Sequence, residues 1–303
     1  MYELELVNVS KTFKNKTAVQ DVNIRLGHGV YGLLGENGAG KTTLMRMLCG
    51  ILKPTRGTIL CDGIPTLQMG GEYRRLLGYL PQDFGYYADF DAQRFLNYIA
   101  ALKAIPEEYA RIKIDELLET VDLAGERKNK LKTFSGGMLR RIGIAQALLN
   151  DPEILILDEP TAGLDPGERV RFRNIISSLG KNRLVILSTH IVSDIACIAD
   201  HIMLMKNGQI THNCREDELL KAAGNCVWTC TVPPQQAGEL EKHCIISNLR
   251  NVGSQVELRI VSGEKPTDDA APAQVTLEDA YLFFTKKNYT LRSMGNIRNM
   301  GDL

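Results

Sequence analysis

The stretch Gly35-Glu36-Asn37-Gly38-Ala39-Gly40-Lys41-Thr42-Thr43 matches the phosphate-loop pattern G-x-x-x-x-G-K-S/T at every fixed position. The apolar run at residues 30–34 before it predicts a buried strand, and residues 44–48 after it have helical spacing. Strand, glycine loop and helix are the context that this motif requires. The alternative is an ordinary glycine-rich turn with a surface lysine, and chance produces such a match in roughly one chain in a hundred.

In a phosphate loop, glycines let successive backbone N–H groups point at phosphate oxygens, and the helix N-terminus adds partial positive charge. We expect Lys41 to reach the β- and γ-phosphates and the Thr42 hydroxyl to ligate Mg²⁺. The residues expected to hold the nucleotide here are Gly35, Asn37, Gly38, Ala39, Gly40, Lys41, Thr42 and Thr43.

Length and composition fit a globular protein with one large and one small domain, since the chain has 303 residues. Lys and Arg number 36, as do Asp and Glu, so no global basic field indicates nucleic acid. No apolar run approaches the roughly 18 residues of a membrane span, and the N-terminus lacks the regions of a signal peptide. The seven cysteines form no CxxC pair, which predicts reduced thiols in the cytosol.

Hydrophobic patterns divide the chain into an α/β part and a smaller, different part. Periodicity is helical from residue 91 to about 131, which predicts a helical subdomain at about 83–150 inserted in a mixed-sheet core. The aliphatic runs at 154–157 and 184–187 are typical of central parallel strands. The pattern changes near residue 214. We predict an α/β nucleotide-binding domain over residues 1–213 and a small α+β accessory domain over 214–303.

The hydrophobic patterns also predict the remaining strands and helices of both domains. Strands are expected at 2–8, 18–26, 58–61, 76–80, 201–206, 227–232, 245–249 and 256–261. Helices are expected at 138–149, 170–179, 191–199, 235–242 and 276–287.

An acidic pair, Asp158 and Glu159, ends the aliphatic run at 154–157. The carboxyl ends of strands in open α/β sheets are where ligands bind. We expect Asp158 to hold Mg²⁺ and Glu159 to orient or deprotonate an attacking water. The alternative is an acidic pair that ends a strand at the surface.

The segment Phe134-Ser135-Gly136-Gly137-Met138 closely resembles the signature of the ATP-binding cassette (ABC) ATPases, usually Leu-Ser-Gly-Gly-Gln. This chain keeps the Ser-Gly-Gly centre and departs at the two ends. The resemblance continues in the expected order over residues 2–212. Phe13 matches the aromatic residue that stacks on adenine, Gln82 the Q-loop glutamine, residues 162–165 the D-loop, and His190 the switch histidine.

The resemblance implies a P-loop NTPase fold in which two nucleotide domains pair head to tail around ATP. Ser135, Gly136 and Gly137 would then contact the γ-phosphate of ATP bound to the partner. Lys41, Glu159 and His190 would be catalytic, with Glu159 as general base and His190 at the γ-phosphate. Thr42, Gln82 and Asp158 would hold Mg²⁺.

One cassette without a membrane segment implies the ATPase subunit of a transporter, with the permease in a separate chain. We expect a cytoplasmic protein, peripheral on the inner face of the membrane, that pairs with a second copy or a related ATPase. The phosphate loop and the C-terminal extension look like those of ABC-2-type exporter ATPases, which include peptide-antibiotic and drug-export subunits. The alternative is a soluble ABC ATPase that acts as a regulatory switch or on nucleic acid or ribosomes. No nucleic-acid partner is expected, because no basic cluster stands out.

Overall fold

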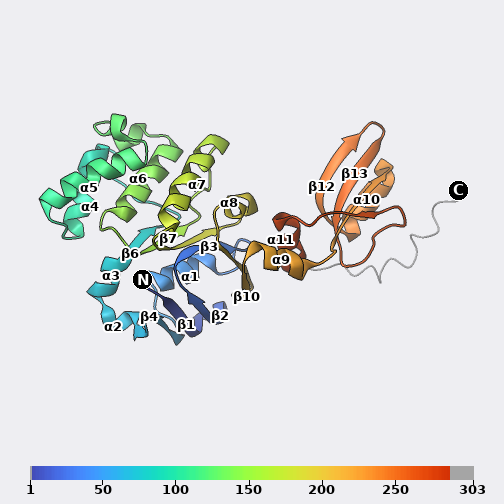
Figure 1. Cartoon of the computed structure of the whole chain (residues 1–303), viewed down its shortest axis with the longest axis horizontal. Coiled ribbons are helices and arrows are strands. Elements are labelled where there is room, and N and C mark those ends of the chain that lie inside the picture. The colour runs from blue at the N-terminus through green and yellow to red at the C-terminus, as the bar shows by residue number, and fades with distance from the viewer. Residues whose placement is uncertain (1, 287–303) are drawn as a thin grey trace. The chain divides into compact units, whose positions relative to one another are not determined.

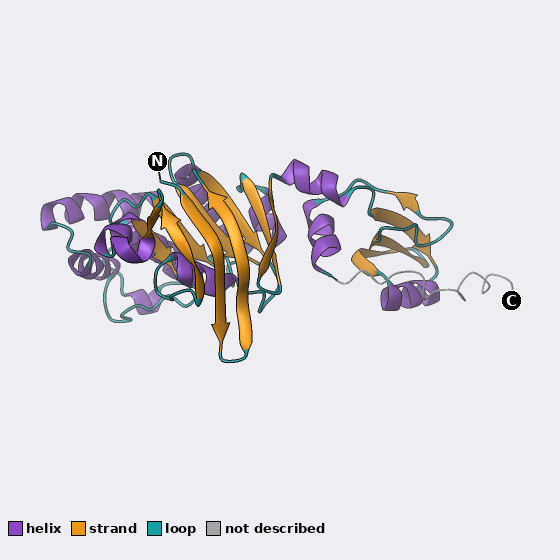
Figure 2. Ribbon diagram, turned by 90° about the horizontal axis from the view of Figure 1, so that it is seen from below, coloured by secondary structure: helices purple, strands orange, loops and turns teal. Residues whose placement is uncertain are grey.

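The computed structural model describes residues 2–286. The chain divides into two compact units, Met1–Asn213 and Cys214–Leu303. Each unit combines strands with helices (Figure 2). Within residues 2–286, no helix is both long enough and apolar enough to cross a membrane.

The first unit is built around a six-stranded sheet with the order β10-β9-β3-β8-β7-β6. Its strands are β3 (Gly29–Leu34), β6 (Leu77–Leu80), β7 (Ile154–Asp158), β8 (Leu184–Thr189), β9 (His201–Lys206) and β10 (Gln209–Cys214). The pairs of β3 with β8 and β9, and of β7 with β6 and β8, are all parallel. Every residue of β3, β7 and β8 is buried, as the aliphatic runs predicted.

A second, antiparallel sheet of the same unit has the order β2-β1-β4-β5. Its strands are β1 (Leu4–Phe13), β2 (Lys16–Leu26), β4 (Arg56–Cys61) and β5 (Ile64–Pro65). Helix α1 (Lys41–Leu48) shares one hydrophobic core with both sheets, where Met45 and Met47 contribute side chains from the helix. The phosphate loop is therefore fixed at both ends by buried elements.

Helices α4 (Ala92–Leu102), α5 (Glu107–Thr120) and α6 (Gly136–Leu148) lie together beside the strands of this unit (Figure 1). They fall within the helical segment expected at about 83–150. The other helices of this unit are α2 (Thr66–Met69), α3 (Gly71–Leu76), α7 (Pro166–Gly180) and α8 (Val192–Ala196), with single 3₁₀ turns at Ala124–Glu126 and Leu131–Thr133.

Helix α7 begins four residues before the predicted 170, since the Asp165 side chain accepts a hydrogen bond from the Glu168 N–H and Pro166 occupies the first turn. The strand predicted from residue 76 starts at Leu77, because α3 runs through Leu76.

The second unit contains a sheet with the order β12-β13-β11-β14. Its elements are α9 (Glu216–Ala223), β11 (Val227–Val232), α10 (Pro234–His243), β12 (Ile245–Val252), β13 (Gln255–Val261), β14 (Ala271–Pro272) and α11 (Leu277–Thr285). Leu258, Ile260 and Leu240 belong to its core. Thr276 caps α11 by accepting a hydrogen bond from the Asp279 N–H, so the helix predicted at 276–287 begins at Leu277. Residue 287 lies outside the described residues.

Candidate nucleotide-binding site

The phosphate loop connects β3 to α1 by a sharp backbone turn at Gly40, whose φ is +111°. A side chain here is excluded, since an added Cβ would lie 2.3 Å from the carbonyl oxygen of Ala18. The loop is also bonded to the chain around it, because Gly208 N–H donates to the Ala39 carbonyl at 2.9 Å. The turn thus presents the N-terminus of α1 as a preformed anion site.

Lys41, the first residue of α1, turns its ammonium group back toward this loop. Its Nζ donates to the Gly35 carbonyl at 2.7 Å and lies 3.4 Å from Oε1 of Glu159. Both side chains are nearly buried, with 6% and 7% of their surface exposed. Lys41 therefore joins the phosphate loop to the carboxylate expected to act as base.

Asp158 lies beside α1 and is fully buried. Its Oδ1 accepts hydrogen bonds from the Thr42 hydroxyl at 3.3 Å and from the Ser188 hydroxyl at 2.6 Å. Its Oδ2 is buried without a hydrogen-bond partner among the described residues. A hydroxyl and a spare carboxylate oxygen are the ligand types that Mg²⁺ takes when substrate phosphates supply the rest, so these residues fit the ion.

Ser188 was not expected from the sequence. Its hydroxyl donates to Asp158 and accepts from the Glu159 N–H at 3.0 Å, so it orders both acidic residues. Asp158 and Ser188 are register partners on the parallel strands β7 and β8. The signal in the sequence was that both residues directly follow an aliphatic run.

Glu159 adopts a left-handed backbone conformation with φ of +47°, which is uncommon for a residue with a side chain. Its Oε2 lies 2.8 Å from Nδ1 of His190, which follows β8. Lys41, Thr42, Asp158, Glu159 and His190 therefore form one linked set, in which Glu159 contacts Lys41 and His190, and Thr42 contacts Asp158, the residue before Glu159.

The other predicted residues lie outside this linked set. Ser135 caps α6 by accepting from the Met138 N–H at 3.2 Å. Gln82 and Gly136 line one cavity of about 450 Å³ together with the D-loop residues 162–164. Phe13 ends β1 with 46% of its surface exposed, and the Lys11 ammonium lies 5.2 Å from its ring centroid.

Comparisons with known proteins identify the family. A family model described as ABC transporter matches residues 19–162. An ABC transporter ATP-binding protein of Bacillus subtilis, YxlF, is 37% identical over 245 residues, which cover 80% of this chain and 81% of that protein. The chain belongs to the ABC transporter ATP-binding proteins.

Two relatives of this ABC protein have named roles. A bacitracin transport ATP-binding protein of Bacillus licheniformis is 39% identical over 72% of the chain and 71% of its own length. A daunorubicin resistance ATP-binding protein of Streptomyces coeruleorubidus is 33% identical over 83% and 80%.

Solved structures agree with this assignment. The ATP-binding subunit of an ABC transporter superposes with a TM-score of 0.66 at 26% identity, covering 73% of this chain and 93% of the other. A dimeric bacterial ABC transporter cassette superposes with a TM-score of 0.64 at 25% identity, covering 70% of this chain and 98% of the other. A dimeric post-hydrolysis cassette with ADP and Pi has the same TM-score, identity and coverage. The predicted ABC fold and the predicted ATPase activity are thereby confirmed. This ABC protein is a transporter ATPase subunit that binds and hydrolyses ATP, and subunits of this kind pair as dimers and work with separate permeases.

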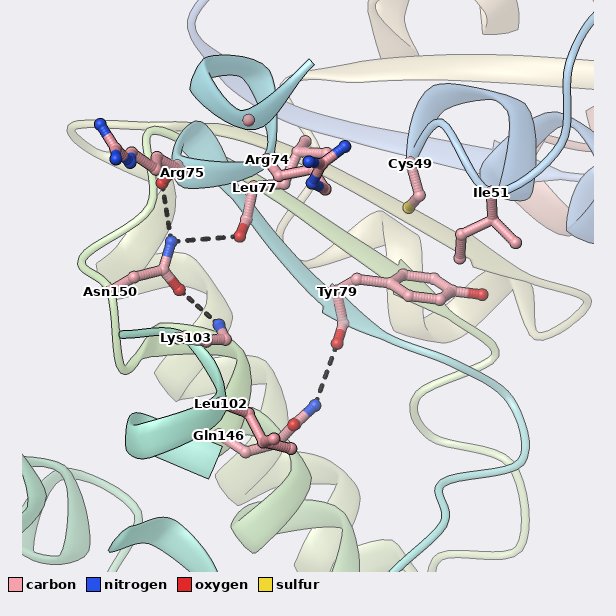
Figure 3. A pocket seen from close by; sticks show the side chains of 11 residues that line it. Cys49, Ile51, Arg74, Arg75, Leu77, Tyr79, Leu102, Lys103, Gln146 and Asn150 are labelled. Carbon is pink, nitrogen blue, oxygen red and sulfur yellow. Dashed lines mark hydrogen bonds between the residues drawn. The ribbon is translucent and has the colours of Figure 1, made fainter. Parts of the chain in front are cut away.

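A further cavity of about 450 Å³ in this ABC protein lies among α3, β6, α4 and α6 (Figure 3). Three cationic residues, Arg74, Arg75 and Lys103, line it, and no carboxylate is among its described lining residues. Its apolar lining is Cys49, Ile51, Leu77, Tyr79 and Leu102. Although much of Lys103 is exposed, its ammonium donates to Asn150 in the cleft, and desolvation lowers the pKa of Lys103 to about 8.

Proposed function

We propose that this chain powers an exporter, as one of two copies that close around ATP and act on a separate permease. The observation that carries the proposal is the linked set at the phosphate loop, in which Glu159 contacts both Lys41 and His190. Export is favoured over import by the bacitracin transport and daunorubicin resistance relatives. The same two relatives favour a transporter over a regulatory or ribosomal ATPase.

Within one copy, the phosphate loop from Gly35 to Thr43 binds the triphosphate, and Phe13 stacks on the adenine. Thr42 and Asp158 hold Mg²⁺, with Gln82 as a further ligand, and the bound ion supplies positive charge to the phosphate oxygens. Glu159 takes a proton from the attacking water. Since Nδ1 of His190 faces Glu159, its Nε2 is the nitrogen that meets a γ-phosphate oxygen.

The partner copy completes the site. Ser135, Gly136 and Gly137 stand at the N-terminus of α6, where backbone N–H groups and a hydroxyl suit a phosphate. In this proposal they bind the γ-phosphate held by the other copy, so loss of that phosphate opens the dimer. Every residue that this proposal assigns to the ATP site belongs to residues 1–213, and residues 214–303 are proposed as an accessory domain.

The permease docks at the basic cleft drawn in Figure 3. Arg74, Arg75 and Lys103 lack a carboxylate in the cleft lining, which favours a partner segment that carries an acidic side chain. The apolar lining suits a hydrophobic side chain of the same segment. Docking there places this ATPase on the inner face of the membrane.

The test is capture of the tagged full-length chain from gently solubilised native membranes. We expect a multi-span membrane protein in about equal amount. Recovery from the soluble fraction alone, with ribosomes, nucleic acid or no partner, would overturn the transporter assignment while leaving the ATPase assignment in place.

A further inference from the structure

A buried ion pair joins α6 to α7 next to the signature segment. Nε of Arg141 on α6 lies 3.1 Å from Oε2 of Glu168 on α7. The side chains have only 7% and 18% of their surface exposed. The pair connects the helix that carries the signature to the helix that follows the D-loop.

Glu168 also contacts the signature itself. An added Cβ on Gly137 would lie 2.7 Å from Cγ of Glu168, so the glutamate stem packs directly on the first turn of α6. Gly137 and Arg141 are four residues apart and therefore lie on the same helix face. Glu168 thus contacts α6 at two successive turns.

Arg141 extends the connection to a third helix. Its Nη1 donates to the carbonyls of Val121 and Asp122, both at 2.8 Å, at the C-terminal end of α5. The planar guanidinium can satisfy these carbonyls and a carboxylate together, which a lysine cannot do with the same geometry.

The backbone of Glu168 holds the D-loop. Its N–H donates to Oδ1 of Asp165 at 2.9 Å, and Asp165 is both the last D-loop residue and the N-cap of α7. One residue therefore contacts the signature through its side chain and the D-loop through its backbone.

We propose that Arg141 and Glu168 are positioning residues for ATP hydrolysis, which hold the γ-phosphate-binding end of α6 at a set position relative to the D-loop. The inference rests on the proposed function, in which that helix end meets ATP bound to the partner copy. Neither side chain touches the nucleotide. Loss of the pair leaves the buried Arg141 charge with only the exposed Asp122 carboxylate, 3.8 Å from Nη1, and shifts the start of α6. Displacements of about 1 Å can cost a catalytic site up to about 100-fold in rate.

The test compares full-length chains with and without Glu168→Gln, a substitution that keeps the size of the side chain and removes its charge. In the Glu159→Gln background, we expect ATP binding to the single subunit to stay within about twofold, because the phosphate loop lies on α1. ATP-driven dimerisation should weaken, and with Glu159 restored kcat should fall, each by about tenfold or more. Arg171→Gln is the matched control, since Nη1 of Arg171 lies 3.6 Å from the same carboxylate but 57% of its side chain is exposed. This control should behave as wild type.

Wild-type dimerisation and kcat in the Glu168→Gln variant would overturn the inference alone. So would a fall in melting temperature and in single-subunit ATP affinity that matches the loss of dimerisation, since that pattern indicates general destabilisation. A Glu159→Gln parent that stays monomeric with ATP would overturn the proposed function, and this inference with it. Should Glu168→Gln fail to fold, Arg141→Lys retains the buried charge and carries the same expectation.

Discussion

Nδ1 of His190 lies 2.8 Å from Oε2 of Glu159, although 31 positions separate the two residues in sequence. The other carboxylate oxygen of Glu159 lies 3.4 Å from the Lys41 ammonium. A left-handed backbone at a non-glycine residue costs on the order of 1–3 kcal/mol, and contacts at both carboxylate oxygens offset that cost. Glu159 is thus held in one orientation, facing the phosphate loop.

Replacing Glu159 by glutamine should separate binding from chemistry. The amide keeps the size of the side chain but cannot accept a proton from water, so kcat should fall about 10²- to 10⁴-fold. ATP affinity should stay close to that of wild type, and light scattering should detect an ATP-bound dimer. The exposed Glu153→Gln is the control, with unchanged phosphate release. Wild-type turnover in Glu159→Gln would remove this residue from the role of base.

Removing the Ser188 hydroxyl should lower the affinity of the enzyme for Mg²⁺ rather than the stability of its fold. Ser188→Ala deletes the 2.6 Å bond to Asp158 and one of two acceptors of the Glu159 N–H, which keeps its bond to the Ser188 carbonyl at 3.1 Å. Loss of such an outer partner typically lowers metal affinity about 10- to 100-fold. A titration of ATPase rate against Mg²⁺ should show a higher half-saturating concentration, with excess Mg²⁺ restoring part of the rate.

The control for this titration is Ser178→Ala on the exposed face of α7, where the hydroxyl donates to the local Ile175 carbonyl at 2.8 Å. If the Mg²⁺ titration of Ser188→Ala coincides with that of wild type, the hydroxyl does not order the metal carboxylate.

The charge of Lys103 should make permease docking depend on pH. Desolvation lowers the pKa of Lys103 to about 8, so the ammonium is charged below this pH and loses its charge above it. A carboxylate on the permease is attracted only to the charged form. Recovery of the permease with the tagged chain should therefore fall between pH 7 and pH 9.

Lys103→Gln should show weaker recovery at pH 7 and a flatter pH profile, with the ATPase rate of the free subunit unchanged. The exposed Lys181→Gln is the control and should follow the wild-type profile. A steep fall with pH in Lys103→Gln would assign the titration to another group.

The stability of the second unit should depend on the ion pair between Arg259 and Asp279. Oδ2 of Asp279 lies 2.6 Å from Nη2 of Arg259, and the Asp279 side chain is 1% exposed. Burial alone would raise the pKa of Asp279, but hydrogen bonds from Arg259, Thr276 and Ser247 outweigh it and lower the pKa. A carboxyl group with a lowered pKa stabilises the fold above its unfolded value, and this contribution is lost as pH falls through the folded value.

Asp279→Asn should therefore destabilise this unit by about 3 kcal/mol at neutral pH, since it leaves Arg259 without its charged partner. Urea unfolding followed through the unit's only tryptophan, Trp228, measures the loss. The exposed Asp217→Asn should change stability by less than about 0.5 kcal/mol. Equal unfolding curves for the two variants would show that the ion pair adds nothing.

The main strands could be predicted because their residues are buried on both faces, which leaves uninterrupted aliphatic runs. Strand β10 was missed because it lies at the sheet edge and alternates exposed with half-buried residues. Strand β1 continues past the predicted end at residue 8, where Asn8 adopts φ of +51° and irregular pairing interrupts the alternation. Helix α9 is short, and three acidic residues fill its first turn, so it offers little periodicity.

In the site too, some residues could be predicted from sequence motifs, whereas others come together only through the fold. The linked residues at the phosphate loop could be predicted because each belongs to a motif with its own spacing. Ser188 has no motif, and only the pairing of β7 with β8 brings it to Asp158. Arg141 and Glu168 are 27 positions apart in the sequence, so no local pattern connects them. They meet only because α6 packs against α7. The roles given to the predicted residues remain predictions for the experiments above.

The residue-by-residue alignment of β7 with β8 restricts which insertions and deletions this protein can tolerate during evolution. The segment between the two strands, including α7, can gain or lose surface residues without changing which position faces Asp158. One residue deleted within β8 would bring Thr189 in place of Ser188 opposite Asp158 and reverse the sheet face of every side chain after the deletion. Length changes in homologues should therefore cluster in the connections and avoid both strands.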